Sequence, residues 1–160
     1  MIKRLVKNER GLTLIELLAV IVILGIIVAI AIPAIGAIID NSKKDAHIAN
    51  AKQMASAARL ALSSGAFDTT KTSFTMQELY EAGYLEKIPK SPGNKTTAYD
   101  TSESIVTIDK QKLTNDGDGS DKGGESVTYK VTLVGNDSGK FKYINNKDVD
   151  SLTRKDVKLE

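Results

Sequence analysis

The chain has 160 residues, a length typical of one domain, and it contains no cysteine, which excludes disulfide bonds. Its formal net charge is +2, but this charge lies mostly at the N-terminus, because without residues 1–11 it falls to −1. A nearly neutral remainder gives no reason to expect nucleic-acid binding by charge alone.

The N-terminal segment combines a short basic stretch with a long apolar run. Residues 1–11 carry a net charge of +3, and the 23 residues from Leu17 to Ile39 carry no charge, amide or hydroxyl group. As a helix, this run would measure about 34 Å, enough to cross a hydrocarbon core of about 30 Å. The positive-inside rule predicts a single-pass membrane protein with a cytoplasmic N-terminus and with residues 40–160 outside.

Helical periodicity continues beyond the apolar run. We predict one helix from about Leu14 to Ser64, ended by Gly65, with a second half that packs small alanines against a sheet. His47, the single histidine, is expected on an exposed helix face, and Asp45 nearby is expected to be solvated. The predicted buried face of this second half consists of Ile48, Ala51, Ala55, Ala58 and Leu62, and the polar face of Lys52, Ser56, Arg59 and Ser63.

A second, short helix is predicted in "TMQELYEAGYL" (75–85). Thr75 can cap this helix, Glu78 stands three residues later as in a capping box, and Gly83 can end it. The following "IPKSPGN" (88–94) is typical of a loop, because its two prolines disfavour helix and its Gly-Asn pair favours a turn.

The remaining sequence predicts β-structure. Residues 104–109, 126–134 and 140–144 are enriched in β-branched or alternating apolar residues, and "GNDSG" between the last two indicates a hairpin. We expect an α+β fold in which three antiparallel strands are covered by the amphipathic half of the long helix. The polar C-terminal tail has only four apolar residues to hold it in place: Val149, Leu152, Val157 and Leu159.

A distinctive order of residues joins the basic stretch to the apolar run: Gly11, Leu12, Thr13, Leu14, Ile15, Glu16. A plain membrane anchor would account for the run, and a cleaved secretory signal would use the A-x-A match at 29–31. In an anchor, Glu16 would sit near the cytoplasmic boundary, where the helix dipole favours a carboxylate and the side chain can reach water. Neither interpretation gives this glutamate a task.

The same order resembles the class III leader of type IV prepilins and related pseudopilins. The resemblance implies that a prepilin peptidase cleaves between Gly11 and Leu12 on the cytoplasmic side and methylates the new amino terminus of Leu12. Glu16 then stands at the fifth mature position, where the family has its assembly glutamate. Leu12 departs from the phenylalanine that is usual at the first mature position.

Two further residues and one later segment fit this resemblance. Gly25 and Pro33 fall at the fourteenth and twenty-second mature positions, within the segment that loosens in family filaments. A proline inside a helix also removes one backbone donor, so a kink or a loosened turn is expected at Pro33. "GYLEKIPKSPGN" (83–94) is similar to the segment after the helix in type II secretion pseudopilins and in Gram-positive, clostridial-like pilins.

The resemblance implies four segments: a leader peptide (1–11), a transmembrane and filament-core helix (12–39), the amphipathic half of that helix (40–64) and a globular head (65–160). It implies a pilin fold and the role of a structural subunit, a major pilin, in a homo-oligomeric filament for adhesion, motility or biofilm formation. The expected partners are the prepilin peptidase, an assembly ATPase and a platform protein. No nucleic-acid partner is expected, except through the filament. The precursor would wait in the cytoplasmic membrane, and the assembled pilus would be extracellular.

Two alternatives stay open. One is a pseudopilin of a type II secretion or competence system, and the other is a membrane-anchored binding module that never polymerises. Asp116, Asp118 and Asp121 lie in a glycine-rich loop at spacings that calcium prefers, although the loop departs from the EF-hand pattern and a solvated loop is the simpler interpretation. No cofactor is otherwise expected. The sequence holds no phosphate-binding loop and no catalytic constellation, so we expect no enzyme.

Overall fold

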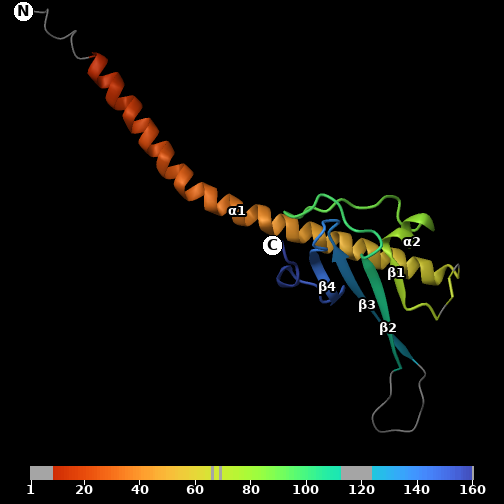
Figure 1. Ribbon diagram of the computed structural model, residues 1–160. Helices are drawn as coiled ribbons and strands as arrows, with labels where there is room; N and C mark the ends of the chain where they lie inside the picture. The colour runs from red at the N-terminus through yellow and green to blue at the C-terminus, as the bar shows by residue number, and fades with distance from the viewer. Residues whose placement is uncertain (1–8, 66, 69, 113–123, 160) are drawn as a thin grey trace, which may run out of the picture. The chain divides into compact units, whose positions relative to one another are not determined.

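The computed structural model describes residues 9–65, 67–68, 70–112 and 124–159 (Figure 1). The chain divides into two compact units, Met1–Asp40 and Asn41–Glu160, and we call the second the head unit. The elements of the chain follow in the order α1 (Glu9–Ser63), β1 (Ser73–Thr75), α2 (Met76–Glu81), β2 (Ile105–Lys112), β3 (Glu125–Val134), β4 (Lys142–Asp148) and a 3-10 turn, η1 (Arg154–Asp156).

Helix α1 has 55 residues, and it begins five residues before the predicted start at Leu14. Nothing between residues 9 and 13 forbids helix, since a single glycine there costs only about 1 kcal/mol. The predicted end is confirmed within one residue. Gly65 adopts the left-handed region, with φ at 69°, and its N–H donates to the carbonyl of Leu62 at 3.4 Å.

Helix α2 confirms the predicted capping box. The Glu78 N–H donates to Oγ1 of Thr75 at 3.1 Å, and the Glu78 carboxylate accepts from the Thr75 N–H at 2.8 Å. Gly83 has φ at 79°, which lets the following chain turn back. The N–H groups of Tyr84 and Leu85 then both donate to the carbonyl of Leu79.

The head unit contains a four-stranded antiparallel sheet in the order β1-β2-β3-β4. The three predicted strands are present, and the hairpin between β3 and β4 is confirmed by the Gly135 N–H donating to the Phe141 carbonyl at 2.7 Å. Strand β4 starts two residues later than expected and continues to Asp148, with irregular register and Asn146 at a φ of 48°. The prediction missed β1, because three residues that lead directly into a helix cap show no alternation of their own.

The second half of α1 covers this sheet, so the predicted α+β fold is confirmed. Ala51, Ala55 and Ala58 are fully buried, as expected, while Ile48 and Leu62 are only partly buried. Small side chains let the helix backbone approach the strands closely, and larger residues fill the rest of the core. These include Met54 on the helix, Phe74 on β1, Val106 on β2, Leu133 on β3 and Ile144 on β4.

His47 is fully buried, so the expectation of an exposed histidine was wrong. Its ring stacks on Tyr143 with the centroids 4.2 Å apart, and its Nδ1 lies 2.7 Å from the Tyr99 hydroxyl. Its Nε2 has no hydrogen-bond partner. Burial disfavours the imidazolium form and lowers the pKa of His47 from 6.5 to about 4.

Tyr143 is the centre of this buried polar cluster. Its hydroxyl accepts a hydrogen bond from the Thr96 N–H at 2.9 Å, which fixes the loop that follows α2. Gly93 in that loop lies so close to the ring that an added Cβ would come within 2.2 Å of the Tyr143 Cε1 atom. The cluster therefore joins α1, the loop and β4 by contacts that leave no spare volume.

The C-terminal segment 149–159, which we call the strap, runs back across α1 and β4. All four of its predicted apolar residues are buried: Val149, Leu152, Val157 and Leu159. Arg154 forms a two-pronged ion pair with Asp45 of α1, with both distances at 2.6 Å. Asp45 is thus paired, where a merely solvated side chain was expected. Because both side chains are about half exposed, the pair positions the strap more than it stabilises the fold.

We predict that Gly93→Ala destabilises the head by about 1–3 kcal/mol, because the buried and hydrogen-bonded Tyr143 ring cannot move away from the added methyl group. Urea denaturation of the full chain in detergent, followed by the near-ultraviolet circular dichroism of its tyrosines, measures this loss. Thr97→Ala, at an exposed position of the same loop, is the matched control. Equal midpoints for the two variants would contradict the close packing.

We also predict that acid destabilises the head through His47. Between pH 6.5 and about 4 the unfolded chain binds a proton that the folded chain does not, so stability falls as the pH is lowered. The expected loss between pH 7 and pH 5 is about 2 kcal/mol, from the same urea measurement. Carboxylates with a lowered pKa, such as Asp156 at about 2, lose their contribution only as the pH falls below about 4, outside this range.

His47→Phe is the control for this pH dependence. Phenylalanine keeps an aromatic ring against Tyr143 but cannot take up a proton. The variant should be less stable at pH 7, because the Tyr99 hydroxyl loses a partner, and its stability should be nearly constant from pH 7 to pH 5. An unchanged pH dependence in this variant would assign the acid sensitivity to another group.

Candidate functional site

The first part of α1 presents apolar side chains that nothing in its own unit covers. From residue 13 to residue 39 every side chain is exposed except that of Ala31, which is half-buried. Leu14 and Ile30 are each 70% exposed. Within the described residues, α1 is the one helix long and apolar enough to cross a membrane. An apolar surface of this extent requires lipid or protein around it.

Glu16 is the single charged residue of this surface between residues 13 and 39. It lies four residues, about one helical turn, after Leu12. Among the described side chains, no basic group lies within 4 Å of its carboxylate. The carboxylate therefore presents all its acceptor positions to whatever surrounds the helix.

The predicted cleavage point, between Gly11 and Leu12, lies within the first turn of α1. The amide groups of a first turn have no acceptor inside the helix, and such ends fray readily. An enzyme acting at this point would need to unwind only this first turn. The bond also lies ahead of the apolar surface, so cutting it would leave that surface attached to the head.

Gly25 and Pro33 lie further along the same surface, about 14 Å and 26 Å of helix from Glu16. A Cβ added at Gly25 would meet nothing within 4 Å, so no contact inside the chain requires glycine there. Helix α1 continues through Pro33, although a proline has no N–H to donate to the carbonyl of Ala29. The structure thus places Glu16, Gly25 and Pro33 on one uncovered helix, without direct contact among them.

The predicted calcium ligands Asp116, Asp118 and Asp121 lie outside the described residues. Within the residues that are described, no group of three or more histidine, cysteine, aspartate or glutamate side chains could hold a metal ion.

Sequence reasoning missed two features of the head unit: the buried cluster around His47 and a recess lined with lysines between β4 and the strap. The pairing of distant segments creates both, and no local pattern marks either one.

Comparison with known proteins finds one match. Residues 6–32 match the family described as the prokaryotic N-terminal methylation motif, which is a pilin-type structural motif rather than an enzyme family. The match includes Gly11, Leu12, Glu16 and Gly25 and ends one residue before Pro33. No curated protein and no solved structure matches the chain. Residues 6–32 therefore carry the prokaryotic N-terminal methylation motif, as does the class III prepilin leader region of type IV pilins and pseudopilins.

Proposed function

We propose that this chain is a pilin, the major structural subunit of a type IV pilus. One observation carries the proposal: the methylation motif runs directly into a helix whose apolar side chains have no cover within their own unit. Cleavage after Gly11 leaves a mature chain that starts at Leu12 and keeps the whole apolar helix. Such a helix is stable in lipid, or side by side with copies of itself, and polymerisation exchanges the first environment for the second.

In this proposal, residues 1–11 are the leader peptide, 12–39 form the filament core and 40–64 cover the sheet, while 65–160 form the outer surface. The precursor lies in the cytoplasmic membrane with its N-terminus inside, and the pilus is extracellular. The partners are a prepilin peptidase, an assembly ATPase and a platform protein. The filament would serve adhesion, motility or biofilm formation.

We assign Glu16 the role of setting the register between neighbouring helices. Its carboxylate would pair with the new amino group of Leu12 in an adjacent copy. Away from water an unpaired carboxylate is costly, whereas a paired one is far less so. Apolar helices slide past each other with little resistance, and one required ion pair penalises every incorrect axial position.

Gly25 and Pro33 are proposed to let the helix loosen in the filament. A Cβ at position 25 would meet no atom of this chain, so packing within the chain does not require glycine there. In this proposal, Gly25 instead provides backbone freedom or lets a neighbouring helix approach closely. The missing donor at Pro33 makes the turn at residues 29–33 the weakest of the apolar part.

A pseudopilin of a type II secretion or competence system is the second candidate, because pseudopilins carry the same N-terminal segment. Calcium bound at Asp116, Asp118 and Asp121 would favour this alternative, and long surface filaments would favour the pilus. The two candidates share the processing steps and differ in what the polymer does.

Processing makes a direct prediction. Mass spectrometry of the cell-associated protein should find a chain that begins with N-methylated Leu12 and lacks residues 1–11. The peptidase cuts at the cytoplasmic face, so the apolar helix must be retained in the same molecule. A chain that still begins at Met1 would instead support a membrane-anchored binding module and would contradict both pilin candidates.

Assembly makes a second prediction. Glu16→Ala should reduce filament yield at least tenfold, because the Leu12 ammonium of the neighbouring copy loses its partner, while cleavage and methylation continue. Filaments sheared from cells are quantified against total processed protein. Asp40→Ala, which removes a carboxylate at the other end of the apolar run, is the matched control and should assemble normally. Normal filament yield from Glu16→Ala would remove the proposed pairing.

A further inference from the structure

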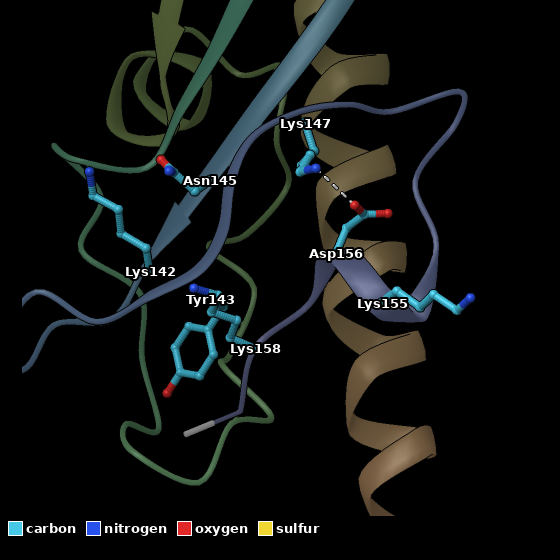
Figure 2. Close-up of a pocket in the computed structure, with 7 residues that line it drawn as sticks. All are labelled: Lys142, Tyr143, Asn145, Lys147, Lys155, Asp156 and Lys158. Atoms are coloured by element: carbon cyan, nitrogen blue, oxygen red, sulfur yellow. Dashed lines mark ion pairs between the residues drawn. The ribbon is translucent and has the colours of Figure 1, made fainter.

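The strap and the edge strand β4 enclose a recess with a strongly basic lining (Figure 2). Its volume is about 360 Å³. Lysines dominate the lining, and Asp156 is the one acidic residue there. The residues that line it are Lys142, Tyr143, Asn145, Lys147, Lys155, Asp156 and Lys158. We call it the basic recess.

Three of these lysines have no acidic partner among the described side chains. Lys147 pairs with Asp156 at 3.0 Å. The carboxylate that lines the recess is therefore already paired with one of the four lysines. Within the described part of the chain, no acidic side chain lies within 4 Å of the ammonium groups of Lys142, Lys155 or Lys158. All three are exposed. Among the described residues, the recess therefore holds more positive than negative charge.

These lysines spread over a surface. Figure 2 shows the ammonium groups of Lys142 and Lys155 pointing in opposite directions from the backbone that carries them. A cage for one small ion would require its donors to converge on a point. Lysines that diverge are better suited to bind several separate anionic groups, such as those arranged across a surface or along a polymer.

The basic recess lies at the end of the head unit where the chain enters it. Lys158 donates its N–H to the Tyr143 carbonyl at 2.9 Å, and Tyr143 stacks on His47. Arg154, next to Lys155, forms an ion pair with Asp45. The head unit begins at Asn41, only about 6 Å and 9 Å of helix before Asp45 and His47. The apolar run ends two residues earlier, at Ile39.

We propose that the basic recess contacts the phosphate groups of anionic phospholipids on the outer surface of the membrane while the chain is anchored there. The headgroup layer adds about 5–8 Å beyond the hydrocarbon core, and charges act in physiological salt over about 8 Å more. Lys155 follows Arg154, which binds Asp45, and Lys158 is bonded to Tyr143, which stacks on His47, so both lysines lie close enough along the chain to reach this layer. The proposal requires an inserted apolar run, but it requires neither cleavage nor polymerisation.

Lysines on an edge strand have a second effect, which is to prevent pairing with the edges of other sheets. That effect accounts for Lys142 and Lys147 on β4. It does not account for Lys155 and Lys158, which belong to the strap. The experiment therefore follows the reactivity of Lys155 and Lys158.

The test uses the full uncleaved chain in lipid nanodiscs, made either of phosphatidylcholine alone or with about one third phosphatidylglycerol. Lysine acetylation by a neutral reagent is followed residue by residue with mass spectrometry at low salt. Phosphatidylglycerol should slow the modification of Lys155 and Lys158 at least threefold, and high salt should reverse the effect. Lys52 and Lys87, exposed lysines outside the recess, should react equally in both nanodiscs.

Variants with equal charge change complete the test. Lys155→Gln/Lys158→Gln should abolish the lipid-dependent protection of Lys142, whereas Lys52→Gln/Lys87→Gln should preserve it. Equal modification rates in the two lipids would overturn the proposal. Protection by inorganic phosphate in phosphatidylcholine nanodiscs, to the same extent as by phosphatidylglycerol, would also overturn it, because that result would indicate a small-anion site. The results are independent of filament formation, so failure here would leave the proposed function unaffected.

Discussion

The structure depends on the apolar half of α1 finding cover outside its own chain. Burying a leucine or isoleucine side chain is worth about 1.5–3 kcal/mol, and this surface presents such residues on every side of the helix. No rearrangement of a polar head of this size could cover a helix that is apolar all round. The head is therefore free to be a self-contained unit, with its own core of alanines, aromatics and β-branched residues. The two halves of one helix are thus suited to different environments.

Much of the fold follows from local patterns in the sequence. The capping box at Thr75 and Glu78, the glycines at 65 and 83 and the apolar face of α1 each depend on residues within a few positions of one another. Such patterns act before tertiary contacts form, so the structure confirms them with small shifts of boundary. Strand β1 was missed because its three residues acquire their conformation only by pairing with β2, 30 to 34 positions away.

His47 shows why local sequence patterns could not predict the remaining features of the head unit. On the helix alone it lies one turn after Lys43 and Lys44, and nothing nearby marks it as buried. Its environment is made by Tyr99 and Tyr143, which lie 52 and 96 residues later and reach it from the loop and from β4. The candidate site differs in this respect. Gly11, Leu12 and Glu16 are neighbours in the sequence, so the motif could be found without a structure, while the proposed partner of Glu16 belongs to another molecule.

The strap has a practical consequence for work on this protein. Leu159, the last described residue, is buried, and its segment is fixed against α1 close to the start of the head unit. A peptide tag or fluorescent fusion placed directly after Leu159 would consequently emerge beside the residues of α1 that begin the head unit. Labels intended to leave the molecule undisturbed belong instead at exposed positions such as Lys87, in the loop beyond α2.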